Sequence, residues 1–339
     1  MTTKPDPNRR VTMRDVARAV DMSPMTVSRA LRGDETVNAQ TRAKIKDVAA
    51  TLGYVYDTTA QAFRTQKSGF VAVTLPSINN ANFAETFRGL SDALADSGLQ
   101  LLLGSTGYDV EKEEELVGQL LTRNPEAIVL TGGYHTDATR KLLIDTRIPV
   151  IETWDLPSDP LGHVVGFSNA AAMSDLVQHL ADRGRQKLAF VGAEAESDQR
   201  GAARLEGLLS AARSLGLPKV EVIVAGRAPI SMSHGAQVVT DLGARIAEFD
   251  ALVCVSDPVA FGALSACQRM GIDVPRQLAI TGFGAFEVSA VSTPRITTVG
   301  VYANQIGAQV AALLQDIFAG KTMPQTIDVG SEIVLGETS

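Results

Sequence analysis

The spacing of hydrophobic positions changes near residue 69 and divides the chain into two parts. Before that point, apolar residues recur at helical intervals, as Met13, Val16, Ala17 and Val20 do. After it, short runs rich in Val, Ile and Leu alternate with helical stretches. The pattern therefore predicts a small all-helical unit followed by a larger α/β unit.

Residues 11–55 are expected to form three short helices in a helix-turn-helix arrangement. Thr12, Ser23 and Asn38 precede the helical stretches and are residue types that cap helix N-termini. Pro24 suits a first helical position, since it has no N–H to lose there. The break at residues 21–22 is short enough to hold two helices at a steep angle. The positions expected to be buried in the second and third helices are Val27, Ala30, Leu31, Ile45, Val48, Ala49 and Leu52.

The second of these helices carries side chains suited to DNA. Its outward positions are Met25, Thr26, Ser28, Arg29 and Arg32. Residues 1–67 hold 12 Lys and Arg against 7 Asp and Glu, a charge of +5, whereas the rest of the chain holds 19 against 31, a charge of −12. A basic head on an acidic body is typical of a nucleic-acid-binding protein. The alternative is three ordinary surface helices.

Residues 11–55 closely resemble the DNA-binding headpiece of the lactose/galactose repressor family of bacterial transcription regulators. The motifs DVA, TVSRAL, TR and LGY stand in the order and spacing of that family. The resemblance implies a homodimer that places the 23–32 helix of each subunit in a major groove of double-stranded, pseudo-palindromic operator DNA. The expected DNA contacts are Thr12, Ser23, Pro24, Met25, Thr26, Ser28, Arg29, Arg32, Asn38, Thr41, Tyr54, Ala60, Phe63 and Arg64.

Two polar segments flank the headpiece. Residues 1–10 are expected to be a disordered arm. Residues 56–68 have the composition of a flexible linker, whereas the resemblance implies a hinge helix that folds when two subunits lie side by side on DNA. Phe63 stands where the family has a leucine that opens a base step, and Phe is also a minor-groove wedge. Tyr56 and Asp57 replace the usual Pro-Asn pair.

Residues 69–339 are expected to form the effector-binding and dimerisation core. Alternating strands and helices predict parallel, doubly wound sheets, and there are too many strands for one compact unit. Segments such as VIETWD, GFSN and QLAITGF resemble the family's core, which has the periplasmic sugar-binding-protein fold of two Rossmann-like halves. The resemblance implies crossings near residues 166, 299 and 323. The first half would then hold residues 69–166 and 300–323, and the second half residues 167–299 and 324–339.

Ligands of such sheets bind beyond the carboxyl ends of the strands. The residues expected there are Ser77, Asn82, Phe83, Tyr108, Thr131, Trp154, Phe167, Arg200, Arg204, Ser256, Asp257, Phe283 and Tyr302, with Ser105, His135 and Asp155 as further loop candidates. By resemblance, Arg204 matches the family's hydroxyl-binding arginine. Asp257 matches the acid of its Asn-Asp pair, with Ser256 in place of the Asn, and Gly284 stands where sugar-binding relatives often carry an Asp.

The charge of the effector follows from two arginines. Arg200 and Arg204 lie within one helical turn of each other, and a carboxylate is the natural partner of a guanidinium. Several segments resemble the branch that includes gluconate-operon repressors. These observations favour a sugar acid such as gluconate over a neutral sugar, although Arg204 would also bind hydroxyl groups.

Other chemistry finds little support in the sequence. The segments GFGAFE and AGKT are incomplete nucleotide-binding motifs, and the four histidines lack metal-ligand spacing. Cys254 and Cys267 are expected to be buried free thiols in a reducing compartment. We expect no cofactor, no bound metal, no membrane association, no enzymatic activity and a cytoplasmic location. The chain is predicted to be a repressor released from DNA by its effector, the alternatives being a corepressor-dependent regulator or activator responding to a neutral sugar, or a sugar-binding protein without DNA function.

Overall fold

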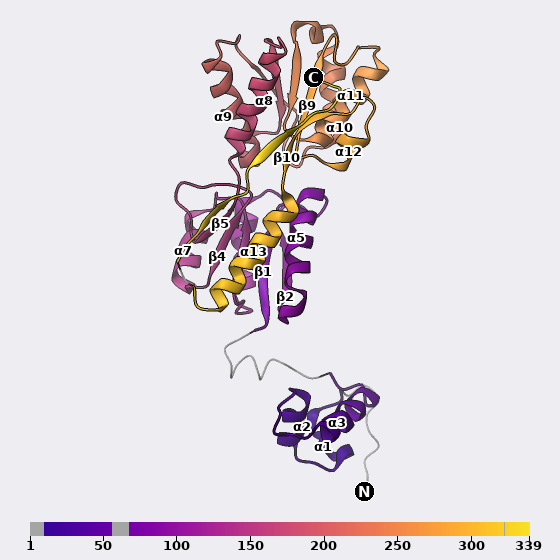
Figure 1. The fold of residues 1–339 in the computed structure, drawn as a ribbon, viewed down its shortest axis with the longest axis vertical. Helices are drawn as coiled ribbons and strands as arrows, with labels where there is room; N and C mark the ends of the chain where they lie inside the picture. The colour runs from indigo at the N-terminus through magenta and orange to yellow at the C-terminus, as the bar shows by residue number, and fades with distance from the viewer. Residues whose placement is uncertain (1–9, 56–67, 322) are drawn as a thin grey trace. The chain divides into compact units, whose positions relative to one another are not determined.

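The computed structural model describes residues 10–55, 68–321 and 323–339, and the chain divides into two compact units between Ser68 and Gly69 (Figure 1). Except for Arg10 and Ser68, the expected arm and hinge lie outside these residues. The three hinge positions expected to contact DNA, Ala60, Phe63 and Arg64, also lie outside them.

The headpiece contains α1 (Met13–Val20), α2 (Pro24–Leu31) and α3 (Ala39–Thr51). The predicted caps are confirmed: Thr26 N–H donates to the Ser23 hydroxyl at 3.1 Å, and Thr41 N–H donates to the Asn38 side chain at 2.8 Å. At α1, the Asp15 carboxylate accepts the Thr12 backbone N–H at 2.9 Å and its hydroxyl at 2.6 Å. Each helix therefore begins where the sequence predicted.

The small core of the headpiece is formed by Val16, Val20, Val27, Ala30 and Ile45, with neighbouring apolar side chains packed around them. One predicted core position is wrong. Leu52 is 37% exposed, because α3 ends at Thr51 and Tyr54 packs against this end of the core instead.

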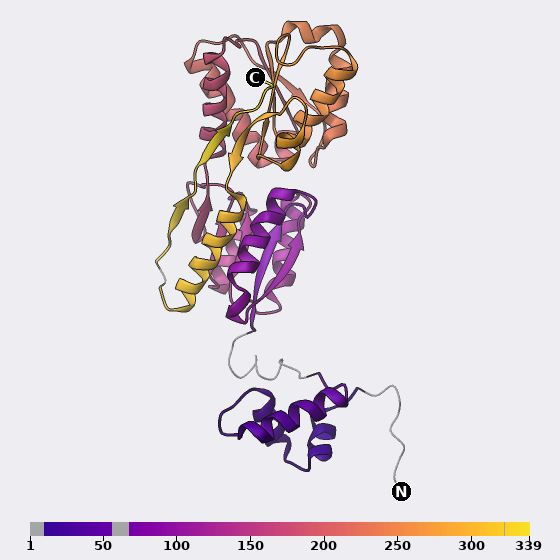
Figure 2. The same ribbon diagram turned by 45° about the vertical axis from the view of Figure 1, so that its right-hand side comes forward.

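The larger unit has two six-stranded sheets, each the centre of one subdomain (Figures 1 and 2). The first sheet has the order β11-β5-β4-β3-β1-β2, and all of its strands are parallel. Its strands are β1 (Phe70–Leu75), β2 (Gln100–Ser105), β3 (Ile128–Thr131), β4 (Val150–Thr153), β5 (His163–Gly166) and β11 (Thr326–Asp328). The strands β3, β4 and β5 are buried throughout, as near-continuous apolar runs predict.

The second sheet has the order β12-β10-β9-β8-β6-β7 and is parallel except for the antiparallel edge strand β12. Its strands are β6 (Leu188–Gly192), β7 (Glu221–Val224), β8 (Ala251–Cys254), β9 (Ala279–Phe283), β10 (Thr297–Val301) and β12 (Ser331–Val334). The predicted fold class, two Rossmann-like subdomains behind a helical headpiece, is therefore confirmed.

Helices cover both sheets. The first subdomain has α5 (Ala81–Ala93), α6 (Val110–Leu121), α7 (Asp137–Thr146) and α13 (Ala303–Phe318). The second has α8 (Asn169–Asp182), α9 (Gln199–Ser214), α10 (Met232–Leu242), α11 (Asp257–Arg269) and the short α12 (Glu287–Val291). The helices α13 and α5 lie side by side (Figures 1 and 2). A Cβ at Gly307 would lie 2.0 Å from the Thr86 carbonyl oxygen, so this close packing requires glycine there.

The chain passes between the subdomains after β5, after β10 and between β11 and β12. The third crossing was expected near residue 323, but Thr326–Asp328 pair with Val164–Gly166 of the first sheet. The crossing therefore lies at residues 329–330, where Gly330 adopts a φ of 70° and turns the chain toward the second sheet. The second crossing also falls slightly later than residue 299, because β10 continues to Val301.

Candidate DNA-binding surface and effector cavity

The helix α2 presents a polar face beside a buried one. Val27 and Ala30 are buried, whereas Met25 is 63% exposed and Arg29 is also exposed. Thr26, Ser28 and Arg32 are half-buried. The helix is thus held by its apolar side, and its other side is free to meet base edges and phosphates.

The remaining headpiece candidates lie at the ends of α1 and α3. Asn38 is exposed, and Thr12, Thr41 and Tyr54 are half-buried. Thr12 and Asn38 stand at helix N-termini, where backbone N–H groups can bind phosphate. Sequence analysis missed Arg42, whose guanidinium donates to the carbonyls of Gly33 at 2.8 Å and Asp34 at 3.4 Å. Arg42 thereby fixes the loop that follows α2.

A cavity of about 500 Å³ lies between the two subdomains of the larger unit. Six predicted residues line it, namely Ser77, Phe83, Tyr108, Arg200, Arg204 and Ser256. The lining that sequence analysis missed comprises Asn79, Asn80, Asp198, Val255, Pro258, Phe286 and residues 228–233. These residues lie in loops or in the first turns of α10 and α11, whose positions no hydrophobic pattern reveals, although the polar residues 231 and 233 after β7 were a usable signal.

Seven predicted effector contacts do not line this cavity. Trp154, Phe167 and Phe283 are buried and form a row of aromatic rings with Phe83, with successive centroids 5.1, 5.9 and 6.2 Å apart. Thr131 is buried at the end of β3, where its hydroxyl donates to the Thr74 carbonyl at 2.8 Å. Asn82 and Tyr302 line a separate open groove, together with Gly284.

Asp257 is fully buried and also lies outside the cavity wall. Its carboxylate accepts the Phe286 N–H at 2.6 Å and the Thr298 hydroxyl at 2.5 Å. Burial raises the pKa of Asp257 to about 6. The side chain therefore holds the loop that carries Phe286, because its oxygens are already engaged within the protein.

The two arginines are the dominant charges of the cavity. Arg204 donates from Nε to Asn169 Oδ1 at 2.9 Å and from Nη1 to the Val255 carbonyl at 2.8 Å. Its Cζ lies 3.8 Å from the Phe283 ring centroid. Burial lowers the pKa of Arg204 to about 10, against the opposing effect of Asp198. A guanidinium in this setting is desolvated but still positively charged at neutral pH.

Arg200 is more loosely held. Its Nη1 is 3.4 Å from the Thr131 carbonyl, and its Cζ lies 5.3 Å and 5.9 Å from the rings of Phe83 and Tyr108. Within residues 10–55, 68–321 and 323–339, neither Arg200 nor Arg204 forms an ion pair with a carboxylate.

Helix N-termini add to this positive potential. The cavity lining includes the N-cap residues of α5, α9, α10 and α11, which are Asn80, Asp198, Ser231 and Ser256. Each helix start carries a partial positive charge. Asp198 adds one negative charge, but its carboxylate accepts the Gly201 N–H at 3.1 Å. Apart from Asp198, the cavity is suited to an anion with hydroxyl groups.

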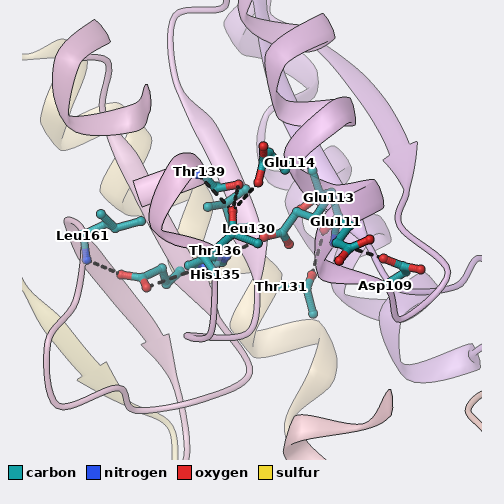
Figure 3. A network of polar contacts seen from close by, with 12 residues as sticks. Asp109, Glu111, Glu113, Glu114, Leu130, Thr131, His135, Thr136, Thr139 and Leu161 are labelled. Atoms are coloured by element: carbon teal, nitrogen blue, oxygen red, sulfur yellow. Dashed lines mark hydrogen bonds and ion pairs between the residues drawn. The ribbon is translucent and has the colours of Figure 1, made fainter. Parts of the chain in front are cut away.

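His135, a loop candidate, is instead part of a buried charge cluster in the first subdomain (Figure 3). Its Nδ1 lies 2.5 Å from Glu113 Oε1, and its Nε2 lies 3.5 Å from Glu152 Oε1. Glu152 also accepts the Leu161 N–H at 2.6 Å. Burial lowers the pKa of His135, but the two carboxylates outweigh it and raise the pKa to about 9. The described part of the chain contains no group of His, Cys, Asp and Glu arranged for a metal.

The comparisons with known proteins agree with this geometry. Residues 12–57 match "Bacterial regulatory proteins, lacI family", and residues 177–339 match "Periplasmic binding protein-like domain". The HTH-type transcriptional regulator GntR of Pseudomonas aeruginosa is 34% identical over 99% of both chains. IdnR of Escherichia coli K12 is 30% identical over 98% of this chain and 99% of its own. A LacI family regulator from Silicibacter pomeroyi has a crystal structure with a TM-score of 0.91 and 29% identity, covering 97% of this chain and 99% of its own.

The headpiece and the two-subdomain core define a helix-turn-helix transcription regulator with a small-molecule cavity. The chain belongs to the LacI family of bacterial regulatory proteins, which confirms the resemblance found in the sequence. It is thus a DNA-binding transcription regulator and not an enzyme. In the described residues, no helix has the length and apolar character needed to cross a membrane.

Proposed function

We propose that this regulator is a cytoplasmic homodimeric repressor that leaves a pseudo-palindromic operator when a sugar acid such as gluconate fills the cavity. One observation carries the choice of effector: Arg200 and Arg204 face the same cavity, and neither has a carboxylate partner among the described residues. A cation withdrawn from water is costly without an anion. A carboxylate from the effector would supply that anion.

The rest of the lining supports the sugar part of such a ligand. Ser77, Asn79, Asn80, Ser231 and Ser233 offer hydroxyl and amide groups around the cavity. Sugar-sized ligands are bound by a few polar groups set among apolar ones. The sequence likeness to the GntR and IdnR regulators agrees with this class of effector.

Release from DNA can be explained by the position of the cavity between two subdomains. The effector contacts both subdomains, so it favours the subdomain arrangement in which those contacts are best. It can weaken DNA binding only if its affinity differs between the DNA-bound and free forms. A corepressor would use the same cavity with the opposite preference. A neutral sugar is the second candidate, because Asp198 lines the cavity and could accept hydroxyl groups.

A mobility-shift titration of full-length protein tests the proposal. The DNA would be a duplex selected from random sequence for tight binding, and the ligands would be gluconate, 2-ketogluconate, idonate, glucose and galactose. We expect an acid to release the DNA and the two neutral sugars to have no effect. Release by a neutral sugar alone would refute the acid, and tighter binding with an acid would establish corepression. Sedimentation of the free protein checks the dimer.

A further inference from the structure

We infer that the two cavity arginines have different tasks: Arg200 binds the carboxylate of the effector and selects acids over neutral sugars, whereas Arg204 is a fixed anchor. This inference rests on the proposed sugar-acid effector. It departs from the family resemblance, which directs attention to Arg204, and it follows from the contacts that each guanidinium makes.

Arg204 is held by groups of its own subdomain. Asn169 begins α8, Val255 follows β8 and Phe283 ends β9, and all three contact the guanidinium. Asn169 also donates from Nδ2 to the Trp154 carbonyl at 3.0 Å, so this contact continues into the first subdomain. Because Nε and Nη1 already donate hydrogen bonds within the protein, the guanidinium of Arg204 is held in place at the cavity wall. Its remaining N–H groups can donate to ligand hydroxyls.

Arg200 reaches across the cavity instead. It starts in the first turn of α9 in the second subdomain, and its guanidinium lies against Phe83, Tyr108 and Thr131 of the first. Its only hydrogen bond to another described residue is the 3.4 Å contact with the Thr131 carbonyl. The contacts with the two rings are cation–π contacts, which leave the N–H donors at the guanidinium edge unused.

A carboxylate suits these unused donors better than a hydroxyl does. A carboxylate accepts two parallel N–H bonds from one guanidinium, and these charge-assisted bonds are stronger than bonds to a neutral group. Gly132 lets the guanidinium lie close to the backbone after β3, since a Cβ at that position would be 3.1 Å from Arg200 Nη1. A neutral sugar offers no such pair of acceptors, so Arg200 discriminates between the two ligand classes.

This position also gives Arg200 a part in regulation. In the structure, the contacts that Arg200 makes across the cavity are with two aromatic rings and, at 3.4 Å, with the Thr131 carbonyl. A bound carboxylate would add a charged partner at the boundary between the subdomains. Binding of the acid is thereby linked to how the subdomains meet, and the linkage is absent for a neutral analogue.

Calorimetry with gluconate and with gluconamide, its neutral amide, tests the division of tasks in full-length protein. We expect the wild type to prefer the acid, and Arg200→Gln to lose about tenfold or more of gluconate affinity with little change for gluconamide. Arg200→Lys should recover only part of the loss, because an ammonium cannot form the paired bonds. Arg204→Gln should weaken both ligands alike. The matched control is Arg213→Gln, an exposed arginine later in α9.

The outcomes separate this inference from the function on which it rests. If wild-type protein binds neither gluconate nor another acid, the proposed effector and this inference both fail. If the wild type binds gluconate but Arg200→Gln keeps the preference for acid and Arg204→Gln loses it, only the division of tasks is overturned. Circular dichroism of each variant checks that the fold is intact. If Arg200→Gln does not fold, Arg200→Lys takes its place. An unchanged preference of Arg200→Lys for gluconate over gluconamide would likewise overturn the division of tasks.

Discussion

The two subdomains share a fold but differ in whether their buried cations have carboxylate partners. In the first, the imidazolium of His135 lies beside the carboxylate of Glu113 (Figure 3) and is also within 3.5 Å of the carboxylate of Glu152. In the second, Arg200 and Arg204 lie at the cavity with no carboxylate in ion-pair distance among the described residues. Charge removed from water requires a partner. The His135 cluster therefore has its partners within the protein and is structural. The two arginines, in contrast, can still pair with the anion of a bound ligand.

Removing the cation of the paired cluster should have the largest effect on stability. His135→Leu leaves Glu113 and Glu152 buried beside an apolar side chain, so we expect the free energy of unfolding to fall by about 3–5 kcal/mol. Urea denaturation followed by circular dichroism measures the change. Lys141→Ala is the control, because it breaks an exposed ion pair with Asp145 and should change little. Equal stability of the two variants would contradict a structural role for the cluster.

The same cluster predicts how stability depends on pH. The pKa of His135 is raised from 6.5 to about 9 in the folded protein. Its stabilisation is therefore complete below pH 6.5, where the unfolded chain also binds the proton, and is lost as the pH rises through about 9. The shift corresponds to a loss on the order of 3 kcal/mol. Denaturation at several pH values should show this decline in the wild type and a smaller one in His135→Leu; parallel curves would speak against it.

The unpaired arginines should respond to ligand instead. Gluconate at about 100 times its Kd should stabilise wild-type protein by about 2.7 kcal/mol through binding to the folded state. Without ligand, Arg200→Gln should be about as stable as the wild type, because no ion pair is lost. With gluconate, that variant should gain much less than the wild type, as measured by urea denaturation. A large loss of stability of Arg200→Gln in the absence of gluconate would show that Arg200 has a structural role, as His135 does.

Local patterns allowed the headpiece to be predicted more fully than the cavity. Ser23 and Asn38 accept backbone N–H groups three residues later, and the Thr12 N–H donates to Asp15, so these capping roles are visible in the sequence. Arg200 and Arg204 were found for a similar reason, since a helix places them one turn apart. Asp257 was expected in the cavity, but its partners Phe286 and Thr298 are distant in sequence and take up its carboxylate.

Long-range pairing accounts for the other differences. The residues of β11 and β12 follow one another with little change of pattern, and only the strand partners β5 and β10 assign them to different sheets. The sequence predicted His135 as a loop candidate for the ligand site, but its partners Glu113 and Glu152 come from α6 and β4. Residues 228–233, which lead into α10, line the cavity; the polar side chains at 231 and 233 hint at a site, but no local pattern gives the direction of this segment. Such features depend on tertiary contacts that no short window of sequence contains.

Arg29 is a cation at the surface and not in the interior, and its substitution has the smallest expected effect. It is an exposed cation on α2, so water solvates it and it requires no internal anion. Its place on the outward face of α2 is what marks it for DNA, where Arg can donate two bonds to one guanine. We expect Arg29→Ala to cost about 1–3 kcal/mol of discrimination between selected and random DNA.

Fluorescence anisotropy with both duplexes measures that discrimination as a ratio of affinities. Arg18→Ala is the matched control, because Arg18 is an exposed cation of α1 that pairs only distantly with Asp15 at 3.6 Å. Loss of a phosphate-directed charge lowers affinity for both duplexes alike, whereas loss of a base contact lowers it mainly for the selected one. Arg29→Ala should therefore change the ratio and Arg18→Ala should not. If both variants kept the wild-type ratio, Arg29 would bind DNA only as a charge, and another residue of α2 would have to select the sequence.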